Sequence, residues 1–424
     1  MCTIFSAGSN AHGQLGHGNE DDSHLFAKCT FSGIDDLLPS GTEVISIVGG
    51  ANHTLILIRE PGISTQLWGA GDGRKGQLGE DYRQSFGTSS IFQRISLPFN
   101  ADTGNITAVA AAWETSYVVF SDSNGDTLLS SGSDDFGDIG TGAQIRGQGF
   151  SRSWQTISFR HLLPESATSI RIGNLKAGPH NILAKLKYRT MSSTLENEII
   201  VGWGAARQGQ LGPLSNTLGK PQPFFSSPVK IDIPYTIQDF AIGNQHTVFL
   251  SIDGHVLGLG SNRKEQLSGL NEMKDVVYLD TTWNGTYLVQ KGADNKCWMV
   301  MAGGSNTHSQ LALDGDSTSS NQLHEVSFDK NTTKGAPEKL VCGSEHILLV
   351  LDNSPFPEDI GVCSSVYGWG WNEHGNLGLG HKQDISRPSL IWPNDILYDG
   401  DSSSEKLIGV WAGCATSWIA VNRL

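Results

Sequence analysis

The 424-residue sequence predicts an all-β fold, a seven-bladed β-propeller that forms a single domain over residues 1–424. Two short apolar patterns each recur seven times along the chain. Glycine accounts for 51 residues and recurs at fixed offsets within these repeats, whereas an ordinary protein contains roughly 7 % glycine. No stretch keeps a helical period of apolar residues for three turns, so we expect almost no helix.

The first pattern is a short apolar run followed by G-x-x-x-x-x-Q-L-G or a relic of it. Its runs are rich in Val, Ile and Leu and are bounded by Gly, Asn, Asp and Ser, which predicts strands. We expect the Leu to fill the core, the Gln to hydrogen-bond the backbone of the turn and the Gly to close the turn. The apolar anchors of the seven copies are Leu15, Leu78, Ile139, Leu211, Leu267, Leu311 and Leu377.

The second pattern is an apolar run, small residues, His-Thr or a substitute, and another apolar run. One repeat position is spread around a ring of blades, so its histidines do not gather into a metal or catalytic centre. We interpret them as buried core residues bonded to a neighbouring turn, and we predict no catalytic residue, metal site or cofactor. The histidines are His53, His180, His246 and His346, and the substitutes are Thr115, Gly285 and Thr416.

Each unit of about 60 residues supplies four short strands, which make one blade. A blade cannot bury both faces alone, so the units must stack on one another. The chain begins with a strand of the first pattern and ends with a strand of the second. We therefore expect one shared blade, in which pairing of the N- and C-terminal strands closes the ring and covers two strand edges.

The composition argues against several classes of partner. The formal net charge of −14 disfavours wrapping of nucleic acid by bulk electrostatics. No apolar run reaches the roughly 18 residues that span a bilayer, so no membrane partner is expected. The start, MCTIFSAGSN, shows no secretory signal, and the six scattered cysteines suit reduced thiols. These features predict a cytoplasmic protein, with the nucleus as a second location.

Candidate binding residues are aromatic and acidic side chains near the ends of the predicted strands. Trp113 and Trp283 lie just before the His-Thr position in two degenerate copies. Residues just past a strand end line one face of a propeller, where aromatic side chains are favourable anchors for a protein partner. Packing between blades remains the alternative for the tryptophans, and a solvated loop remains the alternative for the carboxylates. The predicted partner-binding residues are Trp113, Glu114, Trp283, Glu345, Trp371, Glu373, His374 and Trp411.

Both patterns are similar to those of the regulator-of-chromosome-condensation repeat family, and the similarity covers essentially the whole chain. The degenerate segments 109–119, 304–311, 341–349, 366–378 and 412–421 further resemble a fungal branch of that family, the α-tubulin suppressors or killer-toxin-insensitivity propellers. This resemblance implies a non-enzymatic propeller that forms a heterodimer with a small CSL-type zinc-finger electron carrier. It also implies a role in diphthamide synthesis and, indirectly through Elongator, in modification of wobble uridines of tRNA.

Two other functions stay open. The founding relative of the family is a guanine-nucleotide exchange factor for a Ran-type small GTPase. Its activity goes with a basic tail that reaches chromatin, whereas this chain is acidic and has no cluster of Lys and Arg. The second alternative is an unrelated propeller scaffold for substrate recognition or trafficking.

Overall fold

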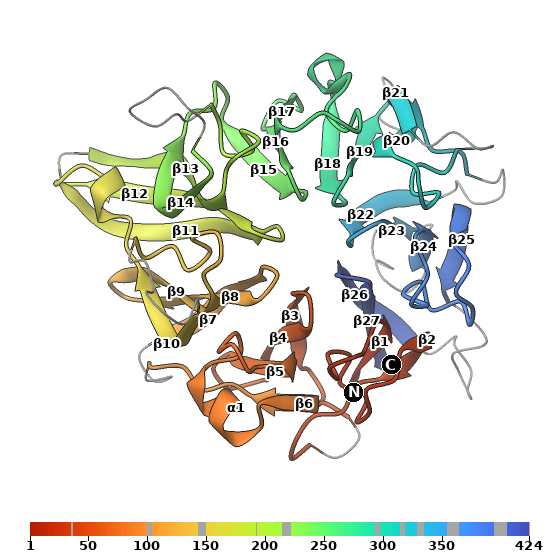
Figure 1. Cartoon of the computed structure of the whole chain (residues 1–424), viewed down its shortest axis with the longest axis horizontal. Coiled ribbons are helices and arrows are strands. Elements are labelled where there is room, and N and C mark those ends of the chain that lie inside the picture. Colours follow the sequence, from red (N-terminus) through yellow and green to blue (C-terminus); the bar gives the residue numbers. More distant parts are fainter. Residues whose placement is uncertain are drawn as a thin grey trace. The chain divides into compact units, whose positions relative to one another are not determined.

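Antiparallel strands make up most of the protein, as the sequence predicts (Figure 1). The computed structural model describes residues 1–34, 37–99, 104–142, 150–191, 193–213, 222–292, 297–313, 319–328, 335–353, 364–393 and 405–423. Within these residues the helical elements are α1 (Glu80–Ser85) and two short 3-10 turns, η1 (Arg160–Leu162) and η2 (Leu270–Glu272). None of the described helices is long and apolar enough to cross a membrane.

The described strands form seven sheets, six of four strands and one of three. The chain divides into two compact units. The first unit contains Met1–Ala11, Leu15–Thr42 and Tyr235–Leu424, and the second contains His12–Gln14 and Glu43–Pro234. The single domain over residues 1–424 stays a prediction.

The second unit contains three sheets, each built from four strands in the order of the chain. Their strands are β3 (Glu43–Gly49), β4 (His53–Arg59), β5 (Gln66–Asp72) and β6 (Thr88–Arg94); β7 (Gly104–Ala111), β8 (Thr115–Asp122), β9 (Gly125–Ser133) and β10 (Phe150–Ile157); and β11 (Ala167–Ala177), β12 (Asn181–Thr190), β13 (Ser193–Ala205) and β14 (Phe224–Ile231).

The first unit contains the other four sheets. One of them has three described strands, β15 (Ile237–Ile242), β16 (His246–Ser251) and β17 (Val256–Gly260), where four were expected. The others are β1 (Cys2–Gly8), β2 (Ser23–Lys28), β26 (Glu405–Gly413) and β27 (Thr416–Arg423); β18 (Val276–Thr281), β19 (Gly285–Lys291), β20 (Trp298–Ser305) and β21 (Ser319–Glu325); and β22 (Ala336–Cys342), β23 (His346–Asp352), β24 (Ser364–Gly370) and β25 (Ile385–Trp392).

The two ends of the chain share one sheet. Strand β1 pairs antiparallel with β27, so that Cys2 lies opposite Asn422 and Gly8 lies opposite Thr416. The markers of the N- and C-termini accordingly lie next to each other on these strands in Figure 1. The predicted pairing of terminal strands is confirmed.

The three roles expected of the Gln-Leu-Gly unit are confirmed in the turns. The side-chain oxygen of Gln310 accepts the backbone N–H of His308 at 2.6 Å, and four other copies repeat this bond at 2.8–3.0 Å. The leucine Leu311 is fully buried. Where the glycines of the pattern are absent, Ser309 and Ala312 still have positive φ angles, 60° and 51°. The turn geometry therefore persists after its sequence signature has decayed.

Three repeat histidines occupy the core as predicted. His53, His246 and His346 are at most 1 % exposed. Their Nε2 atoms lie 2.9, 3.4 and 3.0 Å from hydroxyl oxygens on the second strand of the next sheet, rather than from a turn. Burial disfavours the charged imidazolium, so it lowers the pKa of each histidine to about 4.

His180 is not a core residue, which corrects the interpretation of the fourth repeat histidine. The repeat position lies opposite a glycine of the third strand, as His53 lies opposite Gly71. In the β11–β14 sheet the residue opposite Gly204 is Asn181. Asn181 is fully buried, and His180 precedes it in the turn.

Candidate functional site

The predicted binding residues gather at one edge of their sheets. Because neighbouring strands of each sheet are antiparallel, the turn between its first and second strands lies at the same edge of the sheet as the turn between its third and fourth strands. We call this the turn edge. Seven of the eight predicted residues lie in its turns: Trp113, Glu114, Trp283, Glu345, Trp371, Glu373 and His374.

Trp411 does not lie at the turn edge. It stands inside β26, paired with Trp418, rather than past the end of a strand. Its ring packs over Gly409 and lies 4.9 Å from the ammonium nitrogen of Lys339. This contact is a cation–π arrangement between neighbouring sheets, which favours a packing role.

Backbone hydrogen bonds join the first turns of successive sheets. In the second unit Ala51 donates its N–H to the carbonyl of Trp113 at 2.9 Å, and Trp113 donates to Pro179 at 2.8 Å. These bonds fix the backbone of the turn whatever side chain it carries. The first unit repeats the series, with bonds from Asn244 to Trp283 at 3.0 Å, from Trp283 to Ser344 at 2.8 Å and from Ser344 to Gly413 at 3.1 Å.

An aromatic group in the first unit surrounds Trp371, which is half-buried. Its ring centroid lies 5.7 Å from that of His308 and 5.5 Å from that of His374, the latter edge-on. The indole N–H donates to the carboxylate of Glu373 at 3.2 Å. We call His308, Trp371, Glu373 and His374 the Trp371 surface.

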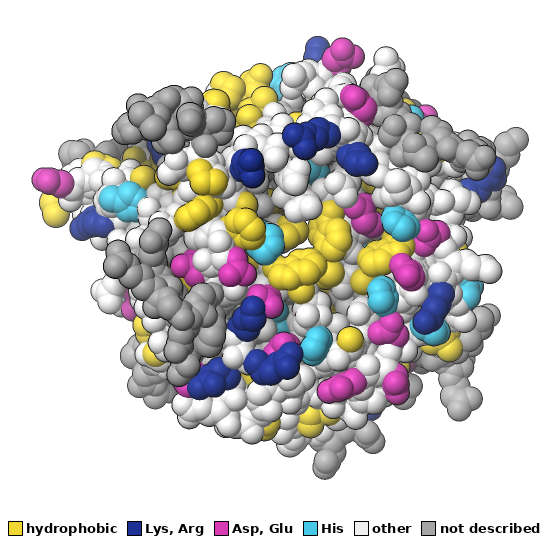
Figure 2. All heavy atoms as spheres, viewed as in Figure 1, with side chains coloured by type: hydrophobic (Ala, Val, Ile, Leu, Met, Phe, Trp, Pro, Cys, Tyr) yellow, Lys and Arg dark blue, Asp and Glu magenta, His cyan; other side chains and the backbone are white. Residues whose placement is uncertain are grey.

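Carboxylates hold both histidines of the Trp371 surface in place. His308 Nδ1 lies 3.1 Å from Asp384, and His374 Nδ1 lies 2.7 Å from Asp22. The second oxygen of Asp384 accepts the backbone N–H of Asn372 at 2.8 Å. Figure 2 shows histidine and acidic side chains beside one another on the face that carries β22–β25 in Figure 1. The surface is therefore aromatic, and contacts with carboxylates position its two histidines.

A second aromatic group lies at the turn edge of the second unit. Trp113 is 37 % exposed and Phe136 is 40 % exposed. The ring of His180 lies 4.6 Å from that of Phe136 and 6.2 Å from that of Trp113. We call Trp113, Phe136 and His180 the Trp113 surface. Exposed aromatic rings in contact with one another are a frequent feature of protein interfaces.

Acidic groups accompany the Trp113 surface. Glu114 forms an ion pair of 2.9 Å with Lys75. Burial raises the pKa of Asp138, whose carboxylate lies 3.8 Å from His180 Nδ1. Burial, together with the neighbouring Asp138 and Asp135, raises the pKa of Asp134 to about 6. Part of the negative charge beside these aromatic rings therefore changes between pH 5 and 7.

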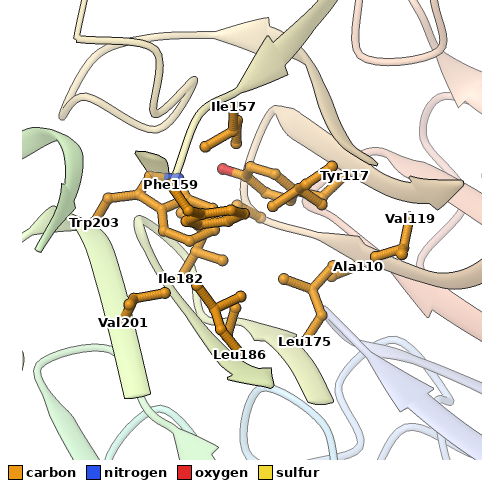
Figure 3. Packing of buried hydrophobic residues seen from close by; sticks show 13 residues of the cluster. Ala110, Tyr117, Val119, Ile157, Phe159, Leu175, Ile182, Leu186, Val201 and Trp203 are labelled. Carbon is orange, nitrogen blue, oxygen red and sulfur yellow. The ribbon is translucent and has the colours of Figure 1, made fainter. Parts of the chain in front are cut away.

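Two buried aromatic side chains support the turn that carries Phe136. Tyr117 and Trp203 both donate to the carbonyl of Asp138, at 2.7 and 3.0 Å. Figure 3 shows these rings packed with Phe159 in the core between two sheets. In the first unit the same construction recurs, with Tyr287 and Trp369 both donating to the carbonyl of Gln310 at 3.0 Å.

Glu345 is not a rim residue, which corrects the prediction for this carboxylate. It is 7 % exposed, and it accepts bonds from Asn284 at 2.6 Å and from Gln310 at 2.9 Å. Burial raises the pKa of its carboxyl group. Glu345 thus links two turns internally, beside the half-buried Trp283 that precedes Asn284.

The sequence interpretation missed Phe136 and His308. Phe136 stands two residues before Asp138, which replaces the Gln of the first pattern, and His308 stands two residues before Gln310. His374 occupies the same position, two residues before Asn376. The other copies have His12, Lys75, Gln208 and Lys264 there. The available signal was that this position varies, whereas the anchor three residues later is always Leu or Ile. Such variation indicates a side chain that the fold does not need.

The described residues hold no group of three or more His, Cys, Asp or Glu side chains placed to bind a metal. The nearest approach to a catalytic arrangement is Ser6, whose hydroxyl lies 2.7 Å from His17 Nε2 and 3.3 Å from the sulfur of Cys29. However, Ser6 donates to the carbonyl of Leu15, and burial raises the pKa of Cys29 to about 12. These contacts are structural.

Comparison with known proteins agrees with this architecture. The sequence model of the regulator of chromosome condensation (RCC1) repeat matches residues 3–57 and 364–414. An RCC1 repeat-containing protein of Schizosaccharomyces pombe is 24 % identical over 99 % of both chains. A secretion-regulating guanine nucleotide exchange factor of Bos taurus is 25 % identical over 92 % of this chain and 78 % of its own.

Solved structures show the same fold at low sequence identity. Human WBSCR16 superimposes over 100 % of both chains with a TM-score of 0.73 and 15 % identity. Prp20p of Saccharomyces cerevisiae, described with its binding to Gsp1p and histones, gives a TM-score of 0.71 and 18 % identity over 100 % of this chain and 92 % of its own. The predicted fold is confirmed, and so is the predicted similarity to the RCC1 repeat family: the chain is a seven-bladed β-propeller that is similar to RCC1-type propellers, and its residues 3–57 and 364–414 match the RCC1 repeat.

Proposed function

We propose that this propeller is a non-enzymatic interaction protein that binds a small CSL-type zinc-finger electron carrier through its turn edge. The observation that carries the proposal is the exposure of aromatic rings there, above all Trp113 and Phe136. Such side chains bury a large area on binding at a low cost in conformational entropy. The choice of partner comes from the resemblance of the degenerate repeats to the fungal α-tubulin suppressors.

In this proposal the propeller regulates when the carrier reaches its acceptors. The complex would act in diphthamide synthesis and, through Elongator, in modification of wobble uridines of tRNA, in the cytoplasm and the nucleus. The fixed backbone of the turn edge suits this task, because a rigid surface loses little freedom when a partner docks. Carboxylates around the rings, such as Glu373 and Glu114, would set orientation and the rate of association.

Binding to the purified carrier tests the proposal. We expect Trp113→Ala or Phe136→Ala to weaken the complex at least tenfold, about 1.4 kcal/mol, because interface aromatics are frequent hot spots. Ile63→Ala is the matched control, since Ile63 is 49 % exposed but lies between β4 and β5, at the opposite edge of its sheet. Calorimetric titration measures all three. Affinity purification that recovers no small zinc-finger protein would count against this partner.

Exchange of guanine nucleotide on a Ran-type GTPase is the second candidate. It is favoured by the similarity to the secretion-regulating exchange factor, which extends over 92 % of this chain. Release of fluorescent GDP from the GTPase, with and without the purified propeller, decides between the two. Clear acceleration would favour exchange, and an unchanged rate would exclude it for that GTPase.

A further inference from the structure

The β15–β17 sheet lacks a fourth strand in the described part of the chain. Residues 261–275 alone separate β17 from β18, and the structure describes all of them. They contain one turn and η2. In the β3–β6 sheet, by contrast, the longer connection of residues 73–103 contains β6. The outer edge of β17 therefore has no described strand beside it.

The backbone groups at this edge are those that bind a fourth strand elsewhere. Gly69 of β5 pairs with Gln93 of β6, and Gly71 pairs further along the same strand. Gly258 and Gly260 are the equivalents in β17, because Gly71 and Gly260 both lie opposite the repeat histidine. Their N–H and C=O groups face the position where a fourth strand would run.

A carbonyl completes this set of hydrogen-bonding groups. The carbonyl of Leu67 accepts the N–H of Ile95 at 2.8 Å, and the carbonyl of Val300 accepts the N–H of Val326 at 2.8 Å. Both carbonyls belong to the residue four before the paired glycine of the third strand. The equivalent residue in β17 is Val256.

The core beneath the edge is nevertheless filled. In the β3–β6 sheet, Ile95 covers Gly69, and a Cβ on that glycine would lie 2.6 Å from the Cδ1 of Ile95. In the β15–β17 sheet Leu270 of η2 takes this place, and its Cδ1 would lie 3.1 Å from a Cβ on Gly258. Leu270 is 1 % exposed. The short turn thus replaces the apolar side chain of a fourth strand but not its backbone.

The edge also lacks the features that protect strand edges from pairing. Outermost strands usually carry a charge or a proline that discourages further strands. The outermost strands of other sheets do so, with Lys28, Arg94, Pro228 and Arg387. Strand β17 reads VLGLG and has neither. Gly258 is half-buried, whereas Gly69 is buried.

We propose that β17 is a docking strand, to which an extended segment of a partner protein adds antiparallel as the fourth strand. The segment would bond the carbonyl of Val256 and the backbone groups of Gly258 and Gly260. Opposite Val256 it needs a small residue, because Leu270 occupies the space that Ile95 fills in the β3–β6 sheet. This strand edge is separate from the turn edge, so the inference does not depend on the proposed function.

A peptide copied from the protein's own fourth strand tests the proposal. The probe is residues 87–96, GTSSIFQRIS, with Ile95→Ala to fit beside Leu270. Hydrogen exchange, followed by NMR, reports on the amides of Gly258 and Gly260. In the isolated protein these amides should exchange faster than those of Gly69 and Gly71, and saturating peptide should slow them at least about tenfold.

Two controls separate strand addition from other contacts. The same peptide methylated on the nitrogen of Gln93 keeps every side chain but loses a backbone donor, so it should give no protection. The unsubstituted peptide should bind Leu270→Ala better than the wild-type protein, because that substitution opens the space for isoleucine. Titrations of the unsubstituted peptide into Leu270→Ala and into the wild-type protein should show the same difference in affinity.

Several outcomes would overturn the proposal. Protection of Gly258 and Gly260 in the isolated monomer would mean that another segment of this chain already covers the edge. A dimer in sedimentation that protects the same amides would mean that the occupant is a second copy. Equal binding of the methylated peptide, or no slowing at the highest soluble peptide concentration, would exclude strand addition.

Discussion

Replacing His346 with threonine should make the protein less sensitive to acid. His346 is fully buried, and burial lowers its pKa from 6.5 to about 4. Below pH 6.5 the unfolded chain takes up a proton that the folded protein excludes, so stability is complete above that pH and is lost as the pH falls toward 4. Threonine suits the position because Thr115 and Thr416 hold it in other sheets.

The size of the effect follows from the pKa difference. At 1.36 kcal/mol per pKa unit, one such histidine costs about 3 kcal/mol across the whole range and about 2 kcal/mol at pH 5. Near pH 5.5 unfolding takes up almost one proton per histidine, which is about 1.2 kcal/mol per pH unit. His53 and His246 have the same lowered pKa, so the three together give about 3.5 kcal/mol per pH unit.

Urea unfolding between pH 5 and 8 measures this slope. His346→Thr should reduce it by about 1.2 kcal/mol per pH unit, even if the variant is less stable throughout because it loses packing and the contact with Ser417. Leu348→Ala is the control, since it removes buried packing from the same strand without removing a titratable group, so it should lower stability but leave the slope unchanged. A slope identical in His346→Thr and the wild-type protein would refute the assignment of a buried neutral imidazole.

Three further predictions concern the turns and their supports. Ser309→Gly should raise the free energy of unfolding by about 0.5–1 kcal/mol in urea titration, since Ser309 has a φ of 60°, whereas Ser309→Val should lower it. Tyr287→Phe removes the bond to the Gln310 carbonyl and should cost about 1 kcal/mol, while that carbonyl keeps its bond from Trp369; a larger loss on thermal unfolding would contradict this. Glu345→Gln sets an amide against the donors of Asn284 and Gln310, so it should lower the free energy of unfolding by about 1–3 kcal/mol. Glu373→Gln is the control, since Glu373 is exposed at the same edge and its substitution should leave stability unchanged.

The sheets could be predicted from the sequence because the contacts that form each turn join residues close together in the chain. The bond between Gln310 and the backbone two residues before it is local, and so is the burial of Leu311 next to it. Seven copies of such a unit leave little doubt about where strands begin and end. A fourth strand was expected in the β15–β17 sheet, where the described residues show three, because Gln266 and Leu267 keep the central part of the turn signature. The short spacing from Leu267 to the next anchor, Leu311, was the signal against it.

The sites were harder to predict because they depend on neighbours that are distant in the sequence. Glu345 is buried by Asn284 and Gln310, which lie 61 and 35 residues away. His180 was placed in the core by pattern, but strand register gives that position to Asn181. Trp411 and Trp113 look alike in sequence, yet one lies inside a strand and the other in a turn.

The backbone bonds that link successive first turns have a consequence for protein engineering. Ala51, Trp113, Asn244 and Ser344 all hold the same link despite their different side chains. New recognition groups can therefore be installed one turn at a time at the positions that are not buried, for example through Trp113→Tyr or Asn244→Trp. Ala51 and Ser344 do not suit this purpose, because both are buried and the Ser344 hydroxyl accepts the N–H of Ala415. A library randomised at Trp113 and Asn244 would sample new binding specificities while the backbone hydrogen bonds of the turns stay in place.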